Sequence, residues 1–484
     1  MNELNFLTAS QLAQLIRERK ASAVEVVDAH LKQIEQHNPA LNAIVTLDAE
    51  RARQRATEAD EALANGGEVW GSLHGVPITI KDSFETAGLR TTSGYPPWAD
   101  YVPQQDAPVV AMLKRAGAIV LGKTNLPPLA DGGQSINPIF GGTNNPWNVA
   151  YTPGGSSGGD AAAVAAGLSP LDMGSDISGS IRMPAHFCGI YGLKPTGGRI
   201  PIRGHRSSVR PLQIPSGWEA LLLMPCAGPL ARSIDDLRLA LIVTADPNTP
   251  ALSSALDRST QSLRIAWSDE MGSLPIDTDT RTSIQTLAAT LAQSGCVVER
   301  QAGPNLNYDE AWQSSGEALA AINTLFQPPF TQFARRLLGL VPSALLPRQP
   351  VMRGLARGAA RRSSRMAALF KQRDVLIQRV ETFLQAWDVW IAPAFSRPAF
   401  THRPLRAPIE IEGRSFSLDL AEIMANVIFN FTGHPVMVIP IGFSRDGLPI
   451  GVQIVGRRWG ELALLDAAQQ IDRAIGSYRR PPAY

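Results

Sequence analysis

The amino-acid sequence predicts an α/β protein built around a β-sheet. Helical and strand-like segments alternate along most of the chain, which is the pattern of such a sheet. Hydrophobic residues make up 44% of the 484 positions, enough for a large buried core. No internal repeat and no sharp change of composition divides the chain. We therefore expect a single domain over residues 1–484.

The N-terminal region, residues 1–66, is predicted to be helical. From Thr8 onward, apolar residues recur three and four positions apart, as they do on one face of a helix. Ser10 and Ser22 stand near the starts of two such runs. They are candidate N-caps, because a serine hydroxyl can accept a hydrogen bond from a free N–H of the first helical turn.

Two strands and a long loop are expected next. The run GVPITIKDSF, residues 75–84, is short and β-branched, and AGAIVLGK, residues 116–123, has the same character. Residues 131–160 are dense in Gly, Asn, Pro and Ser, which is the composition of a loop. A helical run, DAAAVAAG, follows directly. The loop therefore lies within a compact domain, where long loops are often functional.

Helix and strand patterns continue to the C-terminus. LRIAWS is predicted to be a strand, and TSIQTLAATLAQSG a helix. A helical, apolar and Arg-rich insertion is expected at about 320–370. Three short buried strands are then predicted in WDVWIAPAF, HPVMVIPIGF and LPIGVQIVGRRW, followed by a final helix near residues 461–475.

Composition restricts the ligands. The chain has 45 Lys and Arg against 43 Asp and Glu, so no strong field favours nucleic acid, and we expect a small-molecule substrate. The three cysteines are widely spaced and form no CxxC pair, which argues against a disulfide framework or a zinc site. The seven histidines form no HxH or HExxH, and the Gly-rich loop contains no nucleotide-binding motif. No metal and no cofactor is implied.

No segment predicts export or a membrane span. The first twenty residues carry Glu3 and polar positions within any apolar run, unlike a signal peptide. The most apolar later stretch, residues 427–443, is interrupted by Asn430, His434 and two prolines. We expect a cytoplasmic protein.

The residues that suggest a chemistry lie between Thr152 and Thr196. The segment reads TPGGSSGGDAAAVAAGLSPLDMGSDISGSIRMPAHFCGIYGLKPT. Together with GVPITIKDSF upstream and with NFTGHPVMVIP and GLPIGVQIVG near the C-terminus, it resembles the amidase signature family. The resemblance covers most of the chain and weakens between about 200 and 385. It implies a central mixed β-sheet covered by helices on both faces, and hydrolysis of carboxylic amides to an acid plus ammonia or an amine.

The resemblance assigns three catalytic residues. Ser180 follows Ser156 by 24 residues, the spacing of the family's nucleophile and relay serine, and Lys81 occupies the position of the base. The chemistry is consistent, because a serine hydroxyl needs a base, and a lysine acts as one near neutral pH only when burial lowers its pKa. Lys81 follows an apolar run, where such burial is expected. The family also places a cis peptide bond before the relay serine, here between Gly155 and Ser156.

The same resemblance places an oxyanion hole at the backbone N–H groups of Ile177, Ser178, Gly179 and Ser180. N–H groups that converge on a developing oxyanion contribute on the order of 100-fold each to the rate. Most members of the family have Gly at the position of Ser178, so here the backbone must reach the same shape with a Cβ. Asp176 and Arg182, which flank the nucleophile, are expected to support the loop rather than to catalyse.

The substrate pocket is predicted less directly. Ala130 falls where members of the family place a substrate-contacting residue, and Asp131 beside it is a second candidate. Residues 325–352 combine many apolar side chains with arginines, which an interfacial membrane-contacting element requires. The segment resembles the membrane-facing cap of the fatty acid amide hydrolases, and this implies an apolar amide substrate. The alternative, a helical pair packed on the core or at a homodimer contact, stays open.

Two other functions are weighed against hydrolysis. The chain could be the amidase-like subunit of a tRNA-dependent amidotransferase, an assembly component with RNA and protein partners. The apolar, Arg-rich insertion at 320–370 argues against this alternative. A binding protein with a dead site is opposed by the complete set of Lys81, Ser156 and Ser180.

Overall fold

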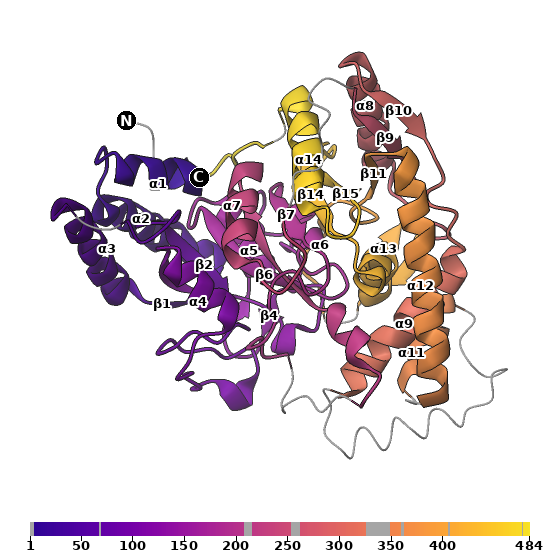
Figure 1. Ribbon diagram of the computed structural model, residues 1–484, viewed down its shortest axis with the longest axis horizontal. Coiled ribbons are helices and arrows are strands. Elements are labelled where there is room, and N and C mark those ends of the chain that lie inside the picture. The colour runs from indigo at the N-terminus through magenta and orange to yellow at the C-terminus, as the bar shows by residue number, and fades with distance from the viewer. Residues whose placement is uncertain are drawn as a thin grey trace.

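One mixed β-sheet of eleven strands forms the centre of the molecule (Figure 1). The computed structural model describes residues 4–66, 69–207, 215–252, 262–325, 349–359, 363–404, 407–476 and 478–484. Within them the strand order is β1-β3-β2-β6-β8-β7-β14-β15-β11-β9-β10. Strands β3, β2 and β6 are parallel, as are β11, β9 and β10, and the strands between β6 and β11 pair antiparallel. The predicted α/β class with a mixed sheet is confirmed.

The strands and helices have the following bounds. The strands of the large sheet are β1 Ile44–Leu47, β2 Pro77–Lys81, β3 Ile119–Thr124, β6 Leu171–Asp176, β7 Tyr191–Lys194, β8 Cys226–Ala231, β9 Arg264–Trp267, β10 Val297–Arg300, β11 Val389–Pro393, β14 Val436–Phe443 and β15 Pro449–Val455. Two small hairpins pair β4 Ile136–Asn137 with β5 Gly141–Gly142, and β12 Pro408–Ile411 with β13 Arg414–Ser417. The α-helices are α1 Ala9–Arg17, α2 Ala23–Leu41, α3 Ala49–Ala64, α4 Pro108–Arg115, α5 Gly158–Ala165, α6 Arg182–Cys188, α7 Ile234–Thr244, α8 Thr278–Gln293, α9 Tyr308–Leu325, α11 Pro350–Ala359, α12 Ser363–Ala386, α13 Leu418–Thr432 and α14 Glu461–Ile475. Short 3-10 helices are η1 Leu4–Phe6, η2 Pro96–Trp98, η3 Pro128–Ala130 and η4 Glu219–Leu223.

Alternate residues of strand β14 show that helices cover both faces of the sheet. Met437 and Ile439 belong to a core that they share with α7, α8 and α14. Val438, between them, packs with residues of α5 and α6. Successive side chains of a strand point to opposite faces, so α14 and α6 lie on opposite sides of the sheet. Figure 1 views the molecule from the side of α7 and α14.

The N-terminal region differs from the prediction in two places. Besides α1, α2 and α3 it contains strand β1, which extends the sheet by pairing antiparallel with β3. Thr8, not Ser10, caps α1, and the Ser10 hydroxyl instead donates to Asp236 Oδ1 at 2.8 Å. Ser22 caps α2 as predicted. The prediction missed β1 because this strand has only four residues and lies between two long helices.

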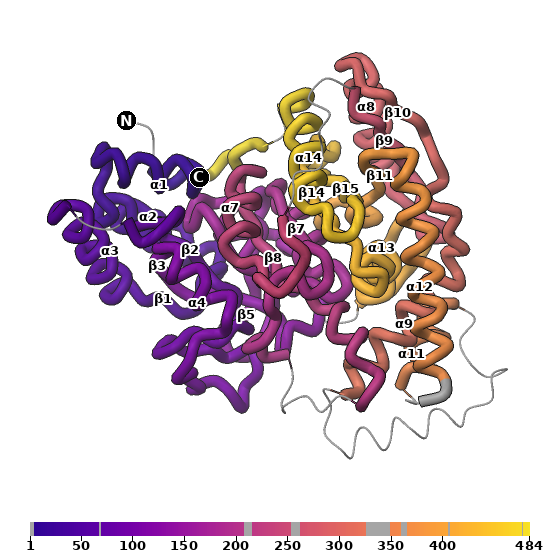
Figure 2. Tube along the Cα trace, viewed as in Figure 1, coloured from indigo at the N-terminus to yellow at the C-terminus, as the bar shows by residue number. Residues whose placement is uncertain are grey.

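The described residues of the predicted insertion near 320–370 are helical, except for Gln349, a bend directly before α11. Helices α9, α11 and α12 gather at one end of the molecule (Figure 2). Glycines let two of these helices touch, since a Cβ at Gly354 of α11 would lie only 2.1 Å from the Gln313 carbonyl oxygen of α9. Most of the predicted membrane-contacting segment 325–352 lies outside the described residues. At its described ends, Leu325 and Val351 are buried and Met352 is exposed.

The other predicted elements match the fold. GVPITIKDSF contains β2, AGAIVLGK contains all of β3 except its last residue, Thr124, and the Gly-rich loop is followed by α5. The three C-terminal apolar runs form β11, β14 and β15, and the final helix is α14. The apolar stretch 427–443 divides between α13 and β14. In the part of the chain that the structure describes, no helix combines the length and the apolar character that a membrane crossing requires.

Candidate active site

Lys81 ends strand β2 inside the sheet, between β3 and β6. Every residue of β2 is buried, so the lysine side chain is carried into the interior rather than to the surface. Its Nζ lies 2.7 Å from Ser156 Oγ, 2.8 Å from Ser157 Oγ and 3.0 Å from Ser175 Oγ. The structure therefore brings together Lys81 and Ser156, which are far apart in sequence, and adds two further hydroxyls.

Ser156 lies in the Gly-rich turn ahead of α5. The peptide bond between Gly155 and Ser156 is cis, as predicted. The glycines around it are required by close packing, because a Cβ at Gly159 would lie 2.3 Å from Asn125 N and one at Gly155 2.5 Å from Gly132 O. What resembles a flexible Gly/Ser linker in the sequence is thus a tightly packed, buried segment.

Ser180 lies on the adjacent loop, between β6 and α6. Its carbonyl oxygen accepts a hydrogen bond from Ser157 N at 3.1 Å, which joins this loop to the serine turn. The side chain is buried, with 4% of its surface exposed. Within the described residues, no hydrogen bond joins the hydroxyls of Ser156 and Ser180. The backbone bond through Ser157 therefore joins the two loops, and the direct hydroxyl contact of a relay between Ser156 and Ser180 is not formed.

The ion pair between Asp176 and Arg182 braces this loop. Arg182 donates to both carboxylate oxygens of Asp176, at 2.8 and 3.1 Å, and both side chains are fully buried. The arginine holds the pKa of Asp176 well below its usual range, although burial alone would raise it. Asn430 of α13 donates to the same carboxylate at 3.0 Å. The expected supporting role of Asp176 and Arg182 is what these contacts provide.

The four predicted oxyanion N–H groups are not equivalent. Gly179 N already donates to Asp176 Oδ1 at 2.9 Å, so this donor is engaged. None of the N–H groups of Ile177, Ser178 and Ser180 donates a hydrogen bond to another described residue. Ser178 is not among the residues with positive φ, so its Cβ is accommodated. Gly179 adopts φ +121°, where a Cβ would lie 2.7 Å from Asn426 Nδ2.

Burial controls the charge of the lysine. Desolvation lowers the pKa of Lys81 from 10.5 to about 8, while the carboxyls of Asp160, Asp176, Asp172 and Glu422 act in the opposite direction. Burial also raises the pKa of Asp160 well above its usual value and that of Asp172 to about 6. Because Asp160 and Asp172 are then partly protonated, they stabilise the charge of Lys81 less than two carboxylates would. The uncharged form of Lys81 is therefore a minority near neutral pH, but a far larger one than for an exposed lysine.

Ala130 and Asp131, the predicted substrate contacts, lie on the turn that contains η3. Ala130 is half-buried and Asp131 is exposed. The turn leads into Gly132 and Gly133, whose backbone packs against Gly155. The two residues are thus placed near the serine turn, on its outer side.

A family comparison matches most of the chain. The model of the family described as Amidase matches residues 25–465. The chain belongs to the amidase family. An amidase cleaves carboxylic amide C–N bonds, and this is the activity class of the chain.

Individual members are similar over nearly their full length. The chain is 34% identical over 475 residues to an indoleacetamide hydrolase of Bradyrhizobium diazoefficiens, covering 97% of this chain and 86% of the relative. It is 32% identical over 508 residues to a glutamyl-tRNA(Gln) amidotransferase subunit of Synechococcus sp. (strain CC9605), covering 98% of each. Among solved structures, a bacterial aryl acylamidase superposes with a TM-score of 0.80 at 26% identity, covering 97% of this chain and 96% of that one. These comparisons establish family and fold.

Several residues at the site were not predicted from the sequence. Ser157 and Ser175 both contact the Lys81 amine, and His205 Nε2 lies 2.8 Å from Ser175 Oγ. Ser157 could have been noticed beside Ser156, and Ser175 beside Asp176. His205 carries no sequence signal, because it belongs to no motif.

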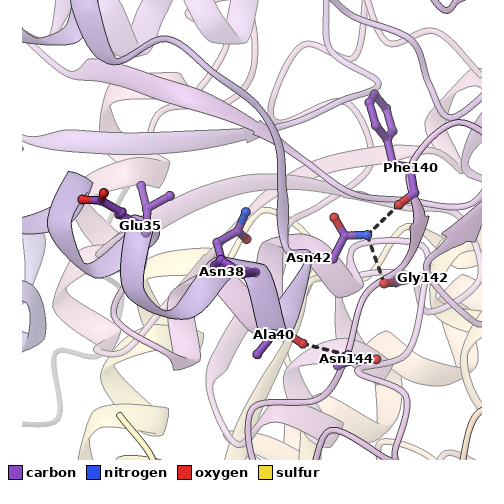
Figure 3. A pocket seen from close by; sticks show the side chains of 9 residues that line it. Glu35, Asn38, Ala40, Asn42, Phe140, Gly142 and Asn144 are labelled. Carbon is purple, nitrogen blue, oxygen red and sulfur yellow. Dashed lines mark hydrogen bonds between the residues drawn. The ribbon is translucent and has the colours of Figure 1, made fainter.

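A surface pocket of about 560 Å³ lies elsewhere, between the end of α2 and the β4–β5 hairpin (Figure 3). Asn42 Nδ2 donates to the carbonyl oxygens of Phe140 and Gly142, and Asn144 Nδ2 donates to that of Ala40. These amide groups are thus used to hold the hairpin on the helix. Lys81, Ser156 and Ser180 do not line this pocket.

Proposed function

We propose that this member of the amidase family hydrolyses carboxylic amides through an acyl-enzyme on Ser180. Ser180 Oγ attacks the amide carbonyl carbon, its proton passes to Ser156, and the Ser156 proton passes to the Lys81 amine. The C–N bond then breaks as the leaving nitrogen takes the proton back through Ser156. Water repeats the sequence on the ester and releases the acid.

The observation that carries this proposal is the 2.7 Å contact between Lys81 Nζ and Ser156 Oγ within a buried environment. Burial favours the uncharged amine that a base requires, and the contact gives the proton a direct path. The N–H groups of Ile177, Ser178 and Ser180 are the proposed oxyanion donors. Gly179 N would join them only after leaving Asp176.

We further propose aryl or otherwise apolar amides as substrates. Support comes from relatives whose names describe such amides, the indoleacetamide hydrolase at 34% identity and the aryl acylamidase at 26%. Incubating the purified chain alone with primary, anilide and long-chain amides, and measuring acid release, tests the proposal. Hydrolysis of none of them by wild type would contradict it. Ser180→Ala is the control for contaminating activity.

The second candidate, an amidotransferase component, rests on 32% identity to the Synechococcus amidotransferase chain over 98% of both proteins. Such a component would release ammonia from glutamine for transfer within a complex. Measuring ammonia release from glutamine beside acid release from the amide panel separates the two functions. We expect turnover of aryl or apolar amides by the chain alone, and glutamine turnover without amide turnover would favour the second candidate.

Location and partners are also proposals. Cys188, Cys226 and Cys296 are free thiols, which fits the expected reducing cytoplasm, and cell fractionation tests the cytoplasmic location.

Peripheral membrane contact through residues 325–352 is supported by the composition of that segment. Sedimentation with anionic liposomes, before and after Leu337 and Leu338 are changed to Asp, tests the membrane contact. Light scattering tests the homodimer alternative.

A further inference from the structure

The Lys81 amine contacts three hydroxyls, and only one of them can give it a proton. A neutral amine has two N–H donors and one lone pair, so it donates to two of the three hydroxyls and accepts from the third. If Ser157 or Ser175 donated to the lone pair, Ser156 could not. The proposed reaction therefore depends on how the hydroxyl protons of the two other serines are directed.

Ser157 has an acceptor of its own. Its Oγ lies 3.3 Å from the carbonyl oxygen of Ser175, which can only accept. A Ser157 hydroxyl that donates to this carbonyl meets the lysine with its oxygen lone pairs. It then accepts from Lys81 Nζ at 2.8 Å.

Ser175 finds its acceptor in His205. The distance from His205 Nε2 to Ser175 Oγ is 2.8 Å, and Ser175 Oγ lies 3.0 Å from Lys81 Nζ. With Nε2 unprotonated, the Ser175 proton points to the imidazole and its lone pairs face the lysine. With Nε2 protonated, Ser175 would be free to donate to the lysine lone pair, in competition with Ser156.

Nε2 can accept from Ser175 when the His205 ring is neutral and carries its one proton on Nδ1, and the surroundings of the ring favour the neutral state. Burial, followed by the nearby charges of Lys81 and Lys123, lowers the pKa of His205 to about 3. The ring packs edge-on against Phe84, with 4.9 Å between the ring centroids.

Its backbone is also fixed beside the base. Glu85 N donates to Gly204 O at 2.9 Å, and Arg206 N donates to Ser83 O at 2.7 Å. The segment 204–206 is therefore paired with residues 83–85, shortly after Lys81 in the chain, and this pairing fixes the position of the imidazole.

We infer that His205 is a positioning residue of the proposed reaction: by accepting the Ser175 proton it leaves Ser156 as the hydroxyl that donates to Lys81. The inference rests on the proposed function. It also accounts for the protonated state, because an ammonium at Lys81 has three donors and meets three hydroxyl oxygens, at 2.7, 2.8 and 3.0 Å. The hydroxyl groups of Ser157 and Ser175 therefore keep the same orientation whether Lys81 is a neutral amine or an ammonium.

A double-mutant cycle tests the inference, with kcat and KM measured on one amide that wild type hydrolyses. His205→Phe removes the acceptor and keeps an aromatic ring against Phe84. We expect kcat to fall on the order of 10-fold or more, with KM changed less than about threefold, because the loss concerns proton transfer and not binding. In a Ser175→Ala background the competing hydroxyl is absent, so adding His205→Phe should change kcat less than about twofold. Equal effects in both backgrounds would show a merely structural role and overturn the inference.

A matched pair of variants covers the case in which His205→Phe does not fold. The Oε1 of a glutamine can occupy the position of histidine Nε2, whereas the shorter asparagine cannot reach it. We expect His205→Gln to stay within about threefold of wild-type kcat and His205→Asn to fall as His205→Phe does. Equal kcat values for the two variants would overturn the inference. If the His205 inference failed in this way, the proposed function would still stand as long as wild type hydrolyses an amide and Ser180→Ala does not. If wild type hydrolysed no amide, the proposed function and the inference about His205 would both be overturned.

Discussion

Lys81 Nζ lies 2.7 Å from Ser156 Oγ at the buried end of a sheet strand. Two elements make this contact: β2 carries the lysine inward, and the Gly-rich turn before α5 carries the serine to it. A charged lysine here would be poorly solvated, and an uncharged one has a hydroxyl partner. Burial therefore favours the uncharged amine by lowering the pKa of Lys81, and the contact gives that amine a hydroxyl from which it can take a proton.

The first prediction concerns the proposed catalytic set. Ser180→Ala should abolish amide hydrolysis, and Ser156→Ala and Lys81→Ala should each lower kcat by several orders of magnitude. Residues that act as a unit are not additive, so the double variant of Ser156 and Lys81 should be little worse than the worse single variant. Steady-state kinetics on a chromogenic amide measures this, with circular dichroism as the check of folding. Near-normal activity in folded Ser180→Ala would contradict the mechanism.

The second prediction concerns pH. The proposed base works only when Lys81 is uncharged, and its pKa is lowered from 10.5 to about 8. The uncharged fraction increases with pH, so kcat/KM should rise through pH 8 and level off above it. A rise that continued to pH 10 would indicate an unperturbed lysine. A rate that increased steadily as pH dropped from 8 to 5 would exclude Lys81 as the base.

The third prediction concerns the brace of the nucleophile loop. Arg182→Met should lower the free energy of unfolding by about 3–5 kcal/mol, because it leaves the Asp176 carboxylate buried without its charged partner. Arg53→Met is the matched control, since Arg53 and Asp28 form an exposed pair whose loss should cost less than about 1 kcal/mol. Urea unfolding measures both. Equal costs would mean that the buried pair is not specially stabilising.

The fourth prediction concerns Gly179. Gly179→Ala should lower kcat on the order of 100-fold, because φ +121° is unfavourable for alanine and the new Cβ would lie 2.7 Å from the Asn426 amide. Gly476→Ala provides the control: φ there is also positive, +61°, but a Cβ would meet nothing within 4 Å. That variant should lose stability by about 1 kcal/mol and keep its kcat. An unchanged kcat in Gly179→Ala would show that the loop tolerates a different shape.

The sequence was most informative where a pattern is local. The apolar run before Lys81 predicted that β2 is buried, and the final helix matched its predicted bounds. The N-cap of α1 was harder to predict, because Thr8 and Ser10 are both residue types that cap helices and lie two positions apart. Only the fold shows that the Ser10 hydroxyl donates to Asp236 instead.

Contacts between distant segments could not be predicted. His205 reaches the site because residues 204–206 pair with residues 83–85, and no periodicity in the sequence records that pairing. The engagement of Gly179 N by Asp176 depends on the exact course of one loop. Glu422 of α13 acts on Lys81 electrostatically from more than 300 positions away. Such long-range contacts depend on tertiary packing.

The last prediction separates the two adjacent serines. Ser156 and Ser157 both lie within 2.8 Å of the Lys81 amine, so distance alone does not identify the relay. Ser157 Oγ, however, has the Ser175 carbonyl as an acceptor at 3.3 Å, and in the proposed arrangement it accepts from the lysine. Ser157→Ala should therefore remove one hydrogen bond to the ammonium and lower kcat on the order of 10-fold, far less than Ser156→Ala.

The comparison of Ser156→Ala with Ser157→Ala requires that both variants fold, because both serine side chains are buried. Thermal melting of the two alanine variants should give similar midpoints, and the difference then belongs to the reaction. If Ser157→Ala proved the more damaging change, the proton path would run through Ser157, and the assignment of Ser156 as the relay would fail.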